Sequence, residues 1–132
     1  MIQAQNIVLV IDDDQAIRTA VTWALSDAGY TVTTAEHGQA ALTKLTQLQP
    51  QLILLDMRMP VMDGWTFARQ YRALPTIHAP IIVMTAAHDA RERAKQIEAN
   101  GHLAKPFDID DLLAMVHQHC GALPPEHPCT TV

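Results

Sequence analysis

Four apolar runs in this chain each end in polar residues that could take part in chemistry. If the runs are parallel strands, these residues meet at one edge of a sheet, where open α/β sheets bind their ligands. Together they would offer carboxylates, a hydroxyl and an ammonium group. The residues are Asp12 and Asp13 after Ile7–Ile11, Asp56 after Leu52–Leu55, Thr85 after Ile81–Met84, and Lys105 after His102–Ala104.

The acids predict a cluster of three carboxylates, Asp12, Asp13 and Asp56. Hard oxygen ligands in a small group suit Mg²⁺. Without a cation such acids would repel one another and one would tend to hold a proton, although Lys105 can offset part of the charge. The alternative is that Asp13 or Asp14 only caps the helix that follows. The run of three aspartates alone does not separate these two interpretations.

A carboxylate such as Asp56 can also attack phosphorus and form an aspartyl-phosphate. The transfer needs a metal for the developing charge and donors for the phosphoryl oxygens. Mg²⁺ could bind one oxygen, Lys105 a second and the Thr85 hydroxyl the third. Threonine is common at strand ends, so Thr85 indicates little by itself. The hypothesis depends on the complete set of residues.

The elements that must position these residues alternate between strand and helix five times. Alternating βα units predict a parallel sheet with right-handed crossovers, and therefore an α/β fold. The run Tyr30–Ala35 alternates in polarity, which makes it the expected edge strand. The expected apolar helix faces are Ile17, Val21, Ala24, Leu25 and Ala28; Ala41, Leu42, Leu45 and Leu48; Phe67, Ala68, Tyr71 and Leu74; and Ile109, Leu112, Leu113 and Val116.

The helix expected over His88–Glu98 has the smallest apolar face, made of Ala90, Ala94 and Ile97. A face of this size buries little area. We therefore expect this helix to dock weakly and to move. The alternative is an ordinary exposed helix.

Composition limits the class of protein. The chain has 132 residues, of which 48% are hydrophobic and 17% charged, as expected for one folded domain. We expect residues 1–120 to form it and the proline-rich residues 121–132 to form a flexible tail. The net charge of -5 disfavours direct binding of nucleic acid. We find no signal peptide and no apolar run of about 20 residues, so we expect a cytoplasmic location and no membrane partner.

The two cysteines, Cys120 and Cys129, are expected to be thiols rather than a disulfide in a cytosolic protein. Histidines near them raise the alternative of a zinc site. His117 and His119 are two positions apart on a helix and so point to different sides. The zinc interpretation, which would also use His127, is therefore disfavoured.

These features resemble the receiver domains of bacterial two-component response regulators, in particular the single-domain, chemotaxis-regulator-like type. The resemblance covers about residues 6–120, in the family's order and spacing. It implies a flavodoxin-like (βα)5 doubly wound parallel sheet of strand order 2-1-3-4-5, with helices on both faces. The matching segments are Val8–Asp14, Leu54–Gly64, Ile81–Ala86 and Leu103–Phe107.

The resemblance also implies roles for single residues. The phosphoryl donor would be a phosphohistidine of a sensor histidine kinase or of a histidine phosphotransfer protein, and the reaction would depend on Mg²⁺. The implied roles are Asp56 as phosphoacceptor, Asp13 as a direct Mg²⁺ ligand, Asp12 as a ligand through water, the backbone carbonyl of Arg58 as a further ligand beside Asp56, Thr85 as the switch hydroxyl, and Lys105 as the site lysine, followed by a cis peptide to Pro106.

The implied function is a phosphoacceptor switch, a regulatory domain that assists its own phosphorylation and dephosphorylation and is not otherwise an enzyme. The surface of the fourth helix, fifth strand and fifth helix would change and control an unidentified protein target. The protein would be a monomer or a phosphorylation-dependent dimer, acting alone or as part of a longer chain. The alternatives are a Mg²⁺-dependent phosphatase or phosphotransferase with an aspartyl-phosphate intermediate, and an interaction module that is not phosphorylated.

One position departs from the family pattern. His102 stands where the family usually has tyrosine or phenylalanine, a ring that turns inward on activation. Imidazole can become charged between about pH 5 and 8, and burying that charge is unfavourable. We therefore hypothesise that activation weakens as pH falls; the alternative is a histidine tolerated at a half-exposed position. Arg58 and Ala87 flank the phosphoryl group in the family, and Arg58 could reach an oxygen of that group or extend into solvent.

Overall fold

The computed structural model describes residues 7–86 and 88–120 of the chain. Within them, five strands and five helices alternate. In chain order they are β1 (Ile7–Ile11), α1 (Gln15–Asp27), β2 (Thr31–Ala35), α2 (Gly38–Lys44), β3 (Leu52–Asp56), α3 (Gly64–Arg72), β4 (Ile81–Ala86), α4 (Ala90–Gln96), β5 (Gly101–Lys105) and α5 (Ile109–His119).

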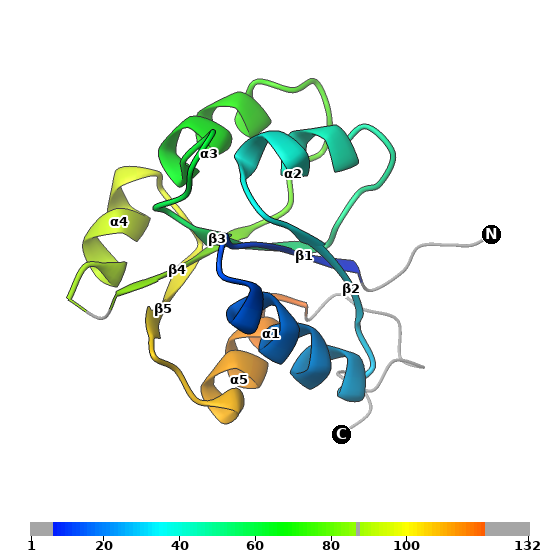
Figure 1. Ribbon diagram of the computed structural model, residues 1–132. Helices are drawn as coiled ribbons and strands as arrows, with labels where there is room; N and C mark the ends of the chain where they lie inside the picture. Colours follow the sequence, from blue (N-terminus) through cyan, green and yellow to red (C-terminus); the bar gives the residue numbers. More distant parts are fainter. Residues whose placement is uncertain (1–6, 87, 121–132) are drawn as a thin grey trace.

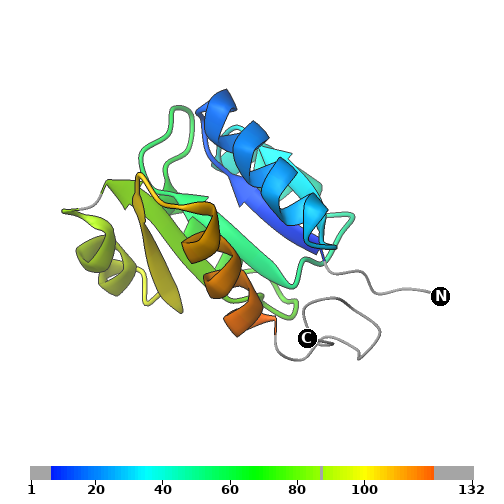
Figure 2. The same cartoon turned by 90° about the horizontal axis from the view of Figure 1, so that it is seen from below.

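The strands form one parallel sheet in the order β2-β1-β3-β4-β5. Helices α1 and α5 cover one face, and α2, α3 and α4 cover the other (Figure 1). In Figure 2 the strand arrows point in one direction, with α1 and α5 in front of the sheet. The predicted doubly wound fold and its strand order are confirmed, and β2 lies at an edge as expected.

The core has two halves, one on each face of the sheet. Successive strand residues point to opposite faces. In β1, Val8 and Val10 pack toward α1 and α5, whereas Leu9 and Ile11 pack toward α2 and α3. The residues Leu52–Leu55 of β3 are fully buried. The central strands β1 and β3 are thus covered on both sides, so the residues at their carboxyl ends are attached to a rigid base.

Helix α2 is shorter than the apolar pattern predicted. It ends at Lys44, so Leu45 is its C-cap and Leu48 lies beyond it. The Thr46 hydroxyl donates to the Thr43 carbonyl at 2.7 Å, a local bond that competes with helix continuation.

In helix α5, Leu112 and Val116 are buried and Leu113 packs against the core as predicted, but Ile109 does not. Ile109 is 46% exposed, although it was expected on the buried face. The buried residues are Leu112, Val116 and Cys120, which are four positions apart. The predicted face therefore began too early: Ile109 is the first residue of the helix, and the stripe that faces the sheet begins at Leu112.

Helix α4 has the small apolar face that the sequence indicated. Ala90 and Ala94 are buried within the helix, and Ile97 is buried directly after it. Asp89 is its N-cap, but the Asp89 side chain makes no capping hydrogen bond. Apolar burial and capping therefore contribute little to holding this helix.

Polar contacts with α3, which the sequence did not indicate, hold the carboxyl end of α4. Trp65 donates from Nε1 to the Gln96 side chain at 2.7 Å, and the Arg93 guanidinium lies 5.1 Å from the centre of the Trp65 ring. Arg72 donates to the carbonyl oxygens of Ile97 and Glu98. We call these contacts the α3–α4 ties.

Candidate functional site

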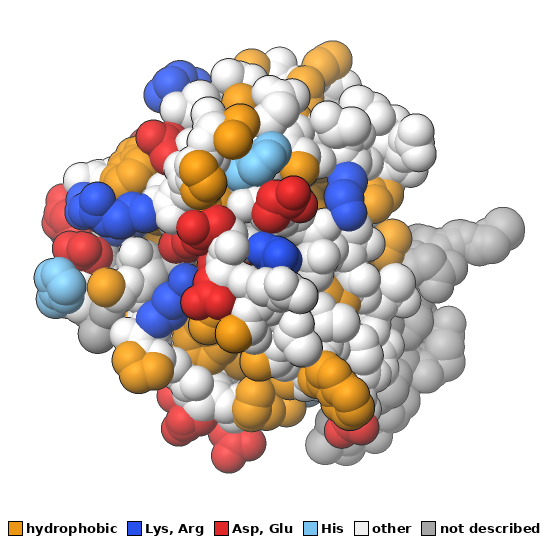
Figure 3. Space-filling view, in the orientation of Figure 1, with side chains coloured by type: hydrophobic (Ala, Val, Ile, Leu, Met, Phe, Trp, Pro, Cys, Tyr) orange, Lys and Arg blue, Asp and Glu red, His pale blue; other side chains and the backbone are white. Residues whose placement is uncertain are grey.

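Three carboxylates meet at the carboxyl ends of β1 and β3. Asp56 is the last residue of β3, and Asp12 and Asp13 directly follow β1, the neighbouring strand. One carboxylate oxygen from each residue lies within 4.8 Å of the others. Figure 3 shows acidic side chains beside lysine or arginine side chains near the centre of this face. The predicted acidic cluster is therefore present in the fold.

The three acids differ in their surroundings. Asp12 is fully buried and Asp56 is 6% exposed, whereas Asp13 is exposed. One Asp12 oxygen accepts from the Asp14 N–H at 2.9 Å, and the other accepts from Lys105 Nζ at 2.7 Å. Asp12 is thus held in place by the protein, while Asp13 faces solvent and is accessible to a ligand.

Lys105 brings a positive charge to the cluster from the far edge of the sheet. It is the last residue of β5, which is separated from β1 by β3 and β4. Its Nζ lies 2.7 Å from Asp12 and 3.7 Å from Asp56, so the closer ion pair is with Asp12. The peptide bond to Pro106 is cis, as the resemblance implied.

Asp56 has a strongly perturbed acidity. Its pKa is raised from 3.8 to about 6, mainly because burial disfavours the charged carboxylate and because Asp12 repels it. The Lys105 ammonium and a hydrogen bond from the backbone of Arg58 act in the opposite direction and lower the pKa. At pH 7 to 8 the carboxylate is still mostly ionised. Burial and the repulsion from Asp12 therefore favour binding of a cation that offsets its negative charge.

The loop after Asp56 is held against the start of α3. The Gly64 N–H donates to the Met57 carbonyl at 2.9 Å, and the Asp63 side chain caps α3 by accepting from the Thr66 N–H at 2.8 Å. A Cβ atom at Gly64 would lie 2.8 Å from the Asp56 carbonyl oxygen, so only glycine permits this close approach. The tight turn fixes the end of β3, which carries the Asp56 carboxylate.

Thr85, the predicted switch hydroxyl, is 4% exposed and lies at the same edge as Asp56, near the end of the neighbouring strand β4. His102 on β5 is exposed rather than half-buried, and it lines a hollow together with Arg91 and Lys95 of α4. Arg58 is exposed, as the solvent-facing alternative expects. Ala87 lies outside the described residues.

Arg18 contacts the site, although no sequence pattern indicated it. It lies in the first turn of α1, and its Nη1 donates to the backbone carbonyl of Asp12 at 2.7 Å. A helix dipole disfavours a cation in the first turn. That unfavourable placement was the available signal that Arg18 has a partner outside the helix.

The zinc alternative gains no support within residues 7–86 and 88–120. There, the acidic cluster is the only grouping of potential metal ligands from three or more His, Cys, Asp or Glu residues. His117 interacts with the Tyr30 hydroxyl, and His119 with the Met115 carbonyl. Cys120 is buried. His127 and Cys129 lie outside the described residues, as does the predicted tail.

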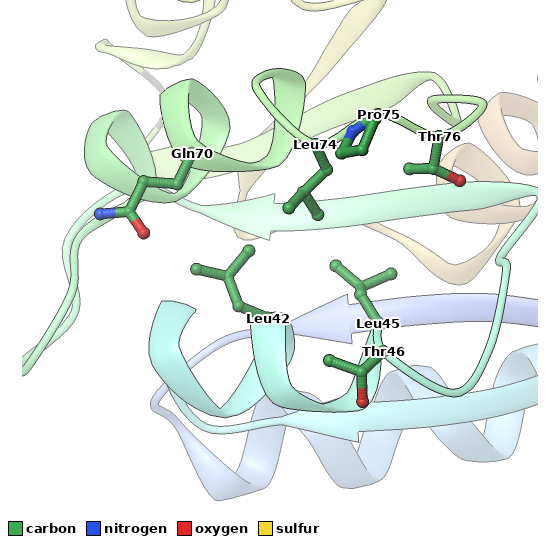
Figure 4. Close-up of a pocket in the computed structure, with 7 residues that line it drawn as sticks. All are labelled: Leu42, Leu45, Thr46, Gln70, Leu74, Pro75 and Thr76. Atoms are coloured by element: carbon green, nitrogen blue, oxygen red, sulfur yellow. The ribbon is translucent and has the colours of Figure 1, made fainter.

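A second hollow, of about 310 Å³, lies between the carboxyl ends of α2 and α3 (Figure 4). Leu42 and Leu45 face Leu74 and Pro75 across it. Its lining contains no charged side chain, so it offers no group for acid–base or phosphoryl chemistry. The acidic cluster therefore remains the candidate site.

No helix within residues 7–86 and 88–120 is both long enough and apolar enough to cross a membrane.

The sequence matches the family model of the response regulator receiver domain over residues 8–117. The chain is 41% identical over 116 residues to the DNA-binding transcriptional regulator NtrC of Salmonella typhimurium, which covers 86% of this chain and 24% of that protein. It is 38% identical over 109 residues to the response regulator MprA of Mycolicibacterium vanbaalenii, covering 81% of this chain and 47% of that protein. The chain thus spans about a quarter to a half of the length of these relatives.

Solved structures show the same fold. The chemotaxis response regulator CheY4 of Vibrio cholerae aligns with a TM-score of 0.80 at 34% identity, covering 88% of this chain and 99% of that one. The response regulator TrrA of Thermotoga maritima, solved in complex with Mg²⁺ and BeF, aligns with a TM-score of 0.75 at 30% identity, covering 86% and 98%.

Proposed function

Because the chain belongs to the response regulator receiver domain family, a signalling family, we propose that it is a phosphoacceptor switch in which Asp56 takes the phosphoryl group. The observation that carries the proposal is the meeting of Asp12, Asp13 and Asp56 with Lys105 at one edge of the sheet. The cluster places the Asp56 carboxylate, a possible nucleophile, beside two acids that can bind a cation and beside the Lys105 ammonium group.

The reaction is a transfer from nitrogen to oxygen. An Asp56 carboxylate oxygen attacks the phosphorus of a phosphohistidine, the P–N bond breaks, and its electron pair stays on the imidazole nitrogen, which takes a proton from solvent. Because the Asp56 pKa is about 6, the carboxylate is ionised and nucleophilic at neutral pH. Lys105, which lies 3.7 Å from Asp56, and a cation bound by the acids would offset the negative charge of the phosphoryl group.

The donor set fits Mg²⁺. Three carboxylate oxygens within 4.8 Å of one another are hard ligands of the kind that this ion prefers. Asp13, Asp56 and the Arg58 carbonyl would bind it, with Asp12 acting through water. When bound, the ion would neutralise charge that develops on the phosphoryl oxygens. Lys105 and the Thr85 hydroxyl would each hold one of the other oxygens.

The output of the switch would be a changed surface on α4, β5 and α5. Phosphorylation would place nearly two negative charges at Asp56, near Lys105 and Thr85, and the loop after Thr85 leads directly into α4. The small apolar face of α4 allows a second position at a modest difference in free energy. The expected partners are a sensor histidine kinase or a histidine phosphotransfer protein, and a downstream protein rather than nucleic acid.

His102 would modulate this switch. It is exposed here, so an active state that buries its ring would have to desolvate it. We expect the active population, measured with a phosphoryl mimic, to fall as the pH is lowered through the range in which histidine becomes charged. A pH-independent population would remove His102 from the mechanism.

The phosphoacceptor is tested by incubating the protein with acetyl phosphate and Mg²⁺ and locating the adduct by mass spectrometry. Wild type should carry one phosphoryl group on the peptide that contains Asp56, and Asp56→Asn should carry none there. Asp63→Asn is the matched control, because asparagine caps α3 as well as aspartate does and labelling should be unchanged. Labelling of Asp56→Asn at the wild-type level would overturn the assignment.

A further inference from the structure

Every polar group of Asp12 has a partner in the structure. Its N–H donates to the Ala35 carbonyl at 3.1 Å, and its carboxylate accepts from Asp14 and Lys105. Its carbonyl oxygen, which lies past the end of β1, accepts from Arg18 Nη1 at 2.7 Å. Asp12 therefore makes four hydrogen bonds. One of them comes from Arg18, a side chain that takes no part in the proposed chemistry of the site.

The bond from Arg18 has a direct consequence for Asp13. The Asp12 carbonyl and the Asp13 N–H belong to one planar peptide unit. A donor that fixes this carbonyl also fixes the plane from which the Asp13 side chain projects. Asp13 is exposed, so burial does little to hold its carboxylate in one direction.

We propose that Arg18 is a positioning residue for the cation site, which orients the Asp12–Asp13 peptide so that Asp13 presents its carboxylate to the ion. The inference rests on the proposed function, because it takes Asp13 as a direct Mg²⁺ ligand. Groups that orient metal ligands from outside the coordination shell commonly change metal affinity when they are removed. Arg18 reaches its partner across the first turn of α1, despite the unfavourable helix dipole.

Two effects of removing Arg18 have opposite signs, which makes the proposal testable. Loss of a positive charge near the cluster should strengthen cation binding. Loss of the bond to the Asp12 carbonyl should weaken it, because Asp13 then samples directions that do not face the ion. The proposal requires the second effect to be the larger one.

The test is a Mg²⁺ titration followed by nuclear magnetic resonance of the backbone amides of Asp13 and Asp56. The variant is Arg18→Met, which keeps the long apolar stem and a good helix propensity but has no donor. We expect its dissociation constant for Mg²⁺ to rise about tenfold. Arg18→Lys, which keeps a charged donor, should lie between Arg18→Met and wild type. Arg69→Met, on the exposed face of α3, is the matched control and should bind as wild type does.

Circular dichroism first establishes a temperature at which all four proteins are folded, and Arg18→Lys carries the test if Arg18→Met does not fold. An Arg18→Met affinity equal to or tighter than wild type overturns the proposal. So does an Arg18→Lys affinity as weak as that of Arg18→Met, because the loss would then not depend on the donor. If wild type itself binds no Mg²⁺ and gains no phosphoryl adduct, the proposed function fails; if wild type does both and Arg18→Met binds equally well, only the role of Arg18 fails.

Discussion

Helices α1 and α4 both follow the carboxyl end of a strand at the candidate site, but they are held by different forces. Helix α1 has thirteen residues, buries Val21 and Leu25, and is capped by the Asp14 side chain. Helix α4 has seven residues, buries two alanines, and has no side-chain cap. Its carboxyl end depends on the α3–α4 ties.

The contrast separates the part that holds the chemistry from the part that can respond to it. Apolar packing around α1 is difficult to rearrange without leaving a void. Polar contacts on a half-exposed surface can be exchanged for water at a small difference in free energy. The acidic turn before α1 is therefore suited to stay fixed, and α4 is suited to change position.

The largest expected effect on stability comes from truncating a core side chain of α1. Leu25 is fully buried, so Leu25→Ala should lower the free energy of unfolding by about 3 kcal/mol. Ile97→Ala, beside α4, should cost about 2 kcal/mol, because Ile97 keeps 7% exposure and its surroundings can close more easily. Urea unfolding measures both. If both variants lost the same free energy of unfolding, the contrast between α1 and α4 would be wrong.

The next effect concerns the ionisation of Asp56 at the carboxyl end of β3. The Asp56 pKa is raised to about 6, so the folded state binds a proton more readily than the unfolded state does. Ionisation of Asp56 therefore lowers stability as pH rises from about 4 through 6. Without Mg²⁺, Asp56→Asn should stabilise the protein by about 1–2 kcal/mol at pH 7.5, with the gain vanishing near pH 4.

The control for this change is Asp89→Asn at the start of α4. Asp89 is paired with Arg93 at 3.6 Å on a partly exposed surface, so its neutralisation should not stabilise the protein. Unfolding curves at both pH values measure the two variants. A gain for Asp56→Asn that is equal at pH 4 and pH 7.5 would contradict the assigned cause.

Capping gives a smaller effect with a clear expected difference. The Asp14 side chain accepts from the Ala16 N–H at 2.9 Å, so Asp14→Ala should cost about 1 kcal/mol. The corresponding change Asp89→Ala removes no capping bond and should cost only a few tenths of a kcal/mol. Thermal unfolding at matched pH compares the two. Equal losses would mean that the two helix starts are held alike.

The smallest global effect should come from the α3–α4 ties. Arg72→Met removes the donor to two carbonyls at the end of α4. We expect amide hydrogen exchange in α4 to rise about fivefold, while exchange in α1 is unchanged. Arg69→Met, on the same helix, is the control. An equal rise in both helices would show a global loss of stability instead of a local release.

Most of the fold and the acidic cluster could be predicted because they follow from residue type and period. An apolar run that ends in aspartate places a charge at a strand end, and parallel strands bring such ends together. The buried face of α5 was harder, because Ile109 and Leu112 both fit a helical period and only the position of the sheet selects between them. The early end of α2 depends on the local bond between Thr46 and Thr43.

The hydrogen-bond partners of two arginines could not have been predicted from the sequence. Arg18 and Arg72 donate to backbone carbonyls, of Asp12 and of Ile97 and Glu98. Every residue has a carbonyl, so the partner has no residue type that a pattern can match. A long cation also reaches several possible acceptors, and only the folded backbone decides which one it meets.

The position of Lys105 at the end of the last strand makes its ion pair with Asp12 a late contact during synthesis. Asp12 and Asp56 leave the ribosome well before Lys105, which ends the last strand. Until β5 pairs with β4, the nascent acids lack their neutralising ammonium group. The ion pair between residues 12 and 105 is thus a late contact that joins the first strand to the last. A translating chain halted before β5 would carry an acidic cluster without its counter-charge.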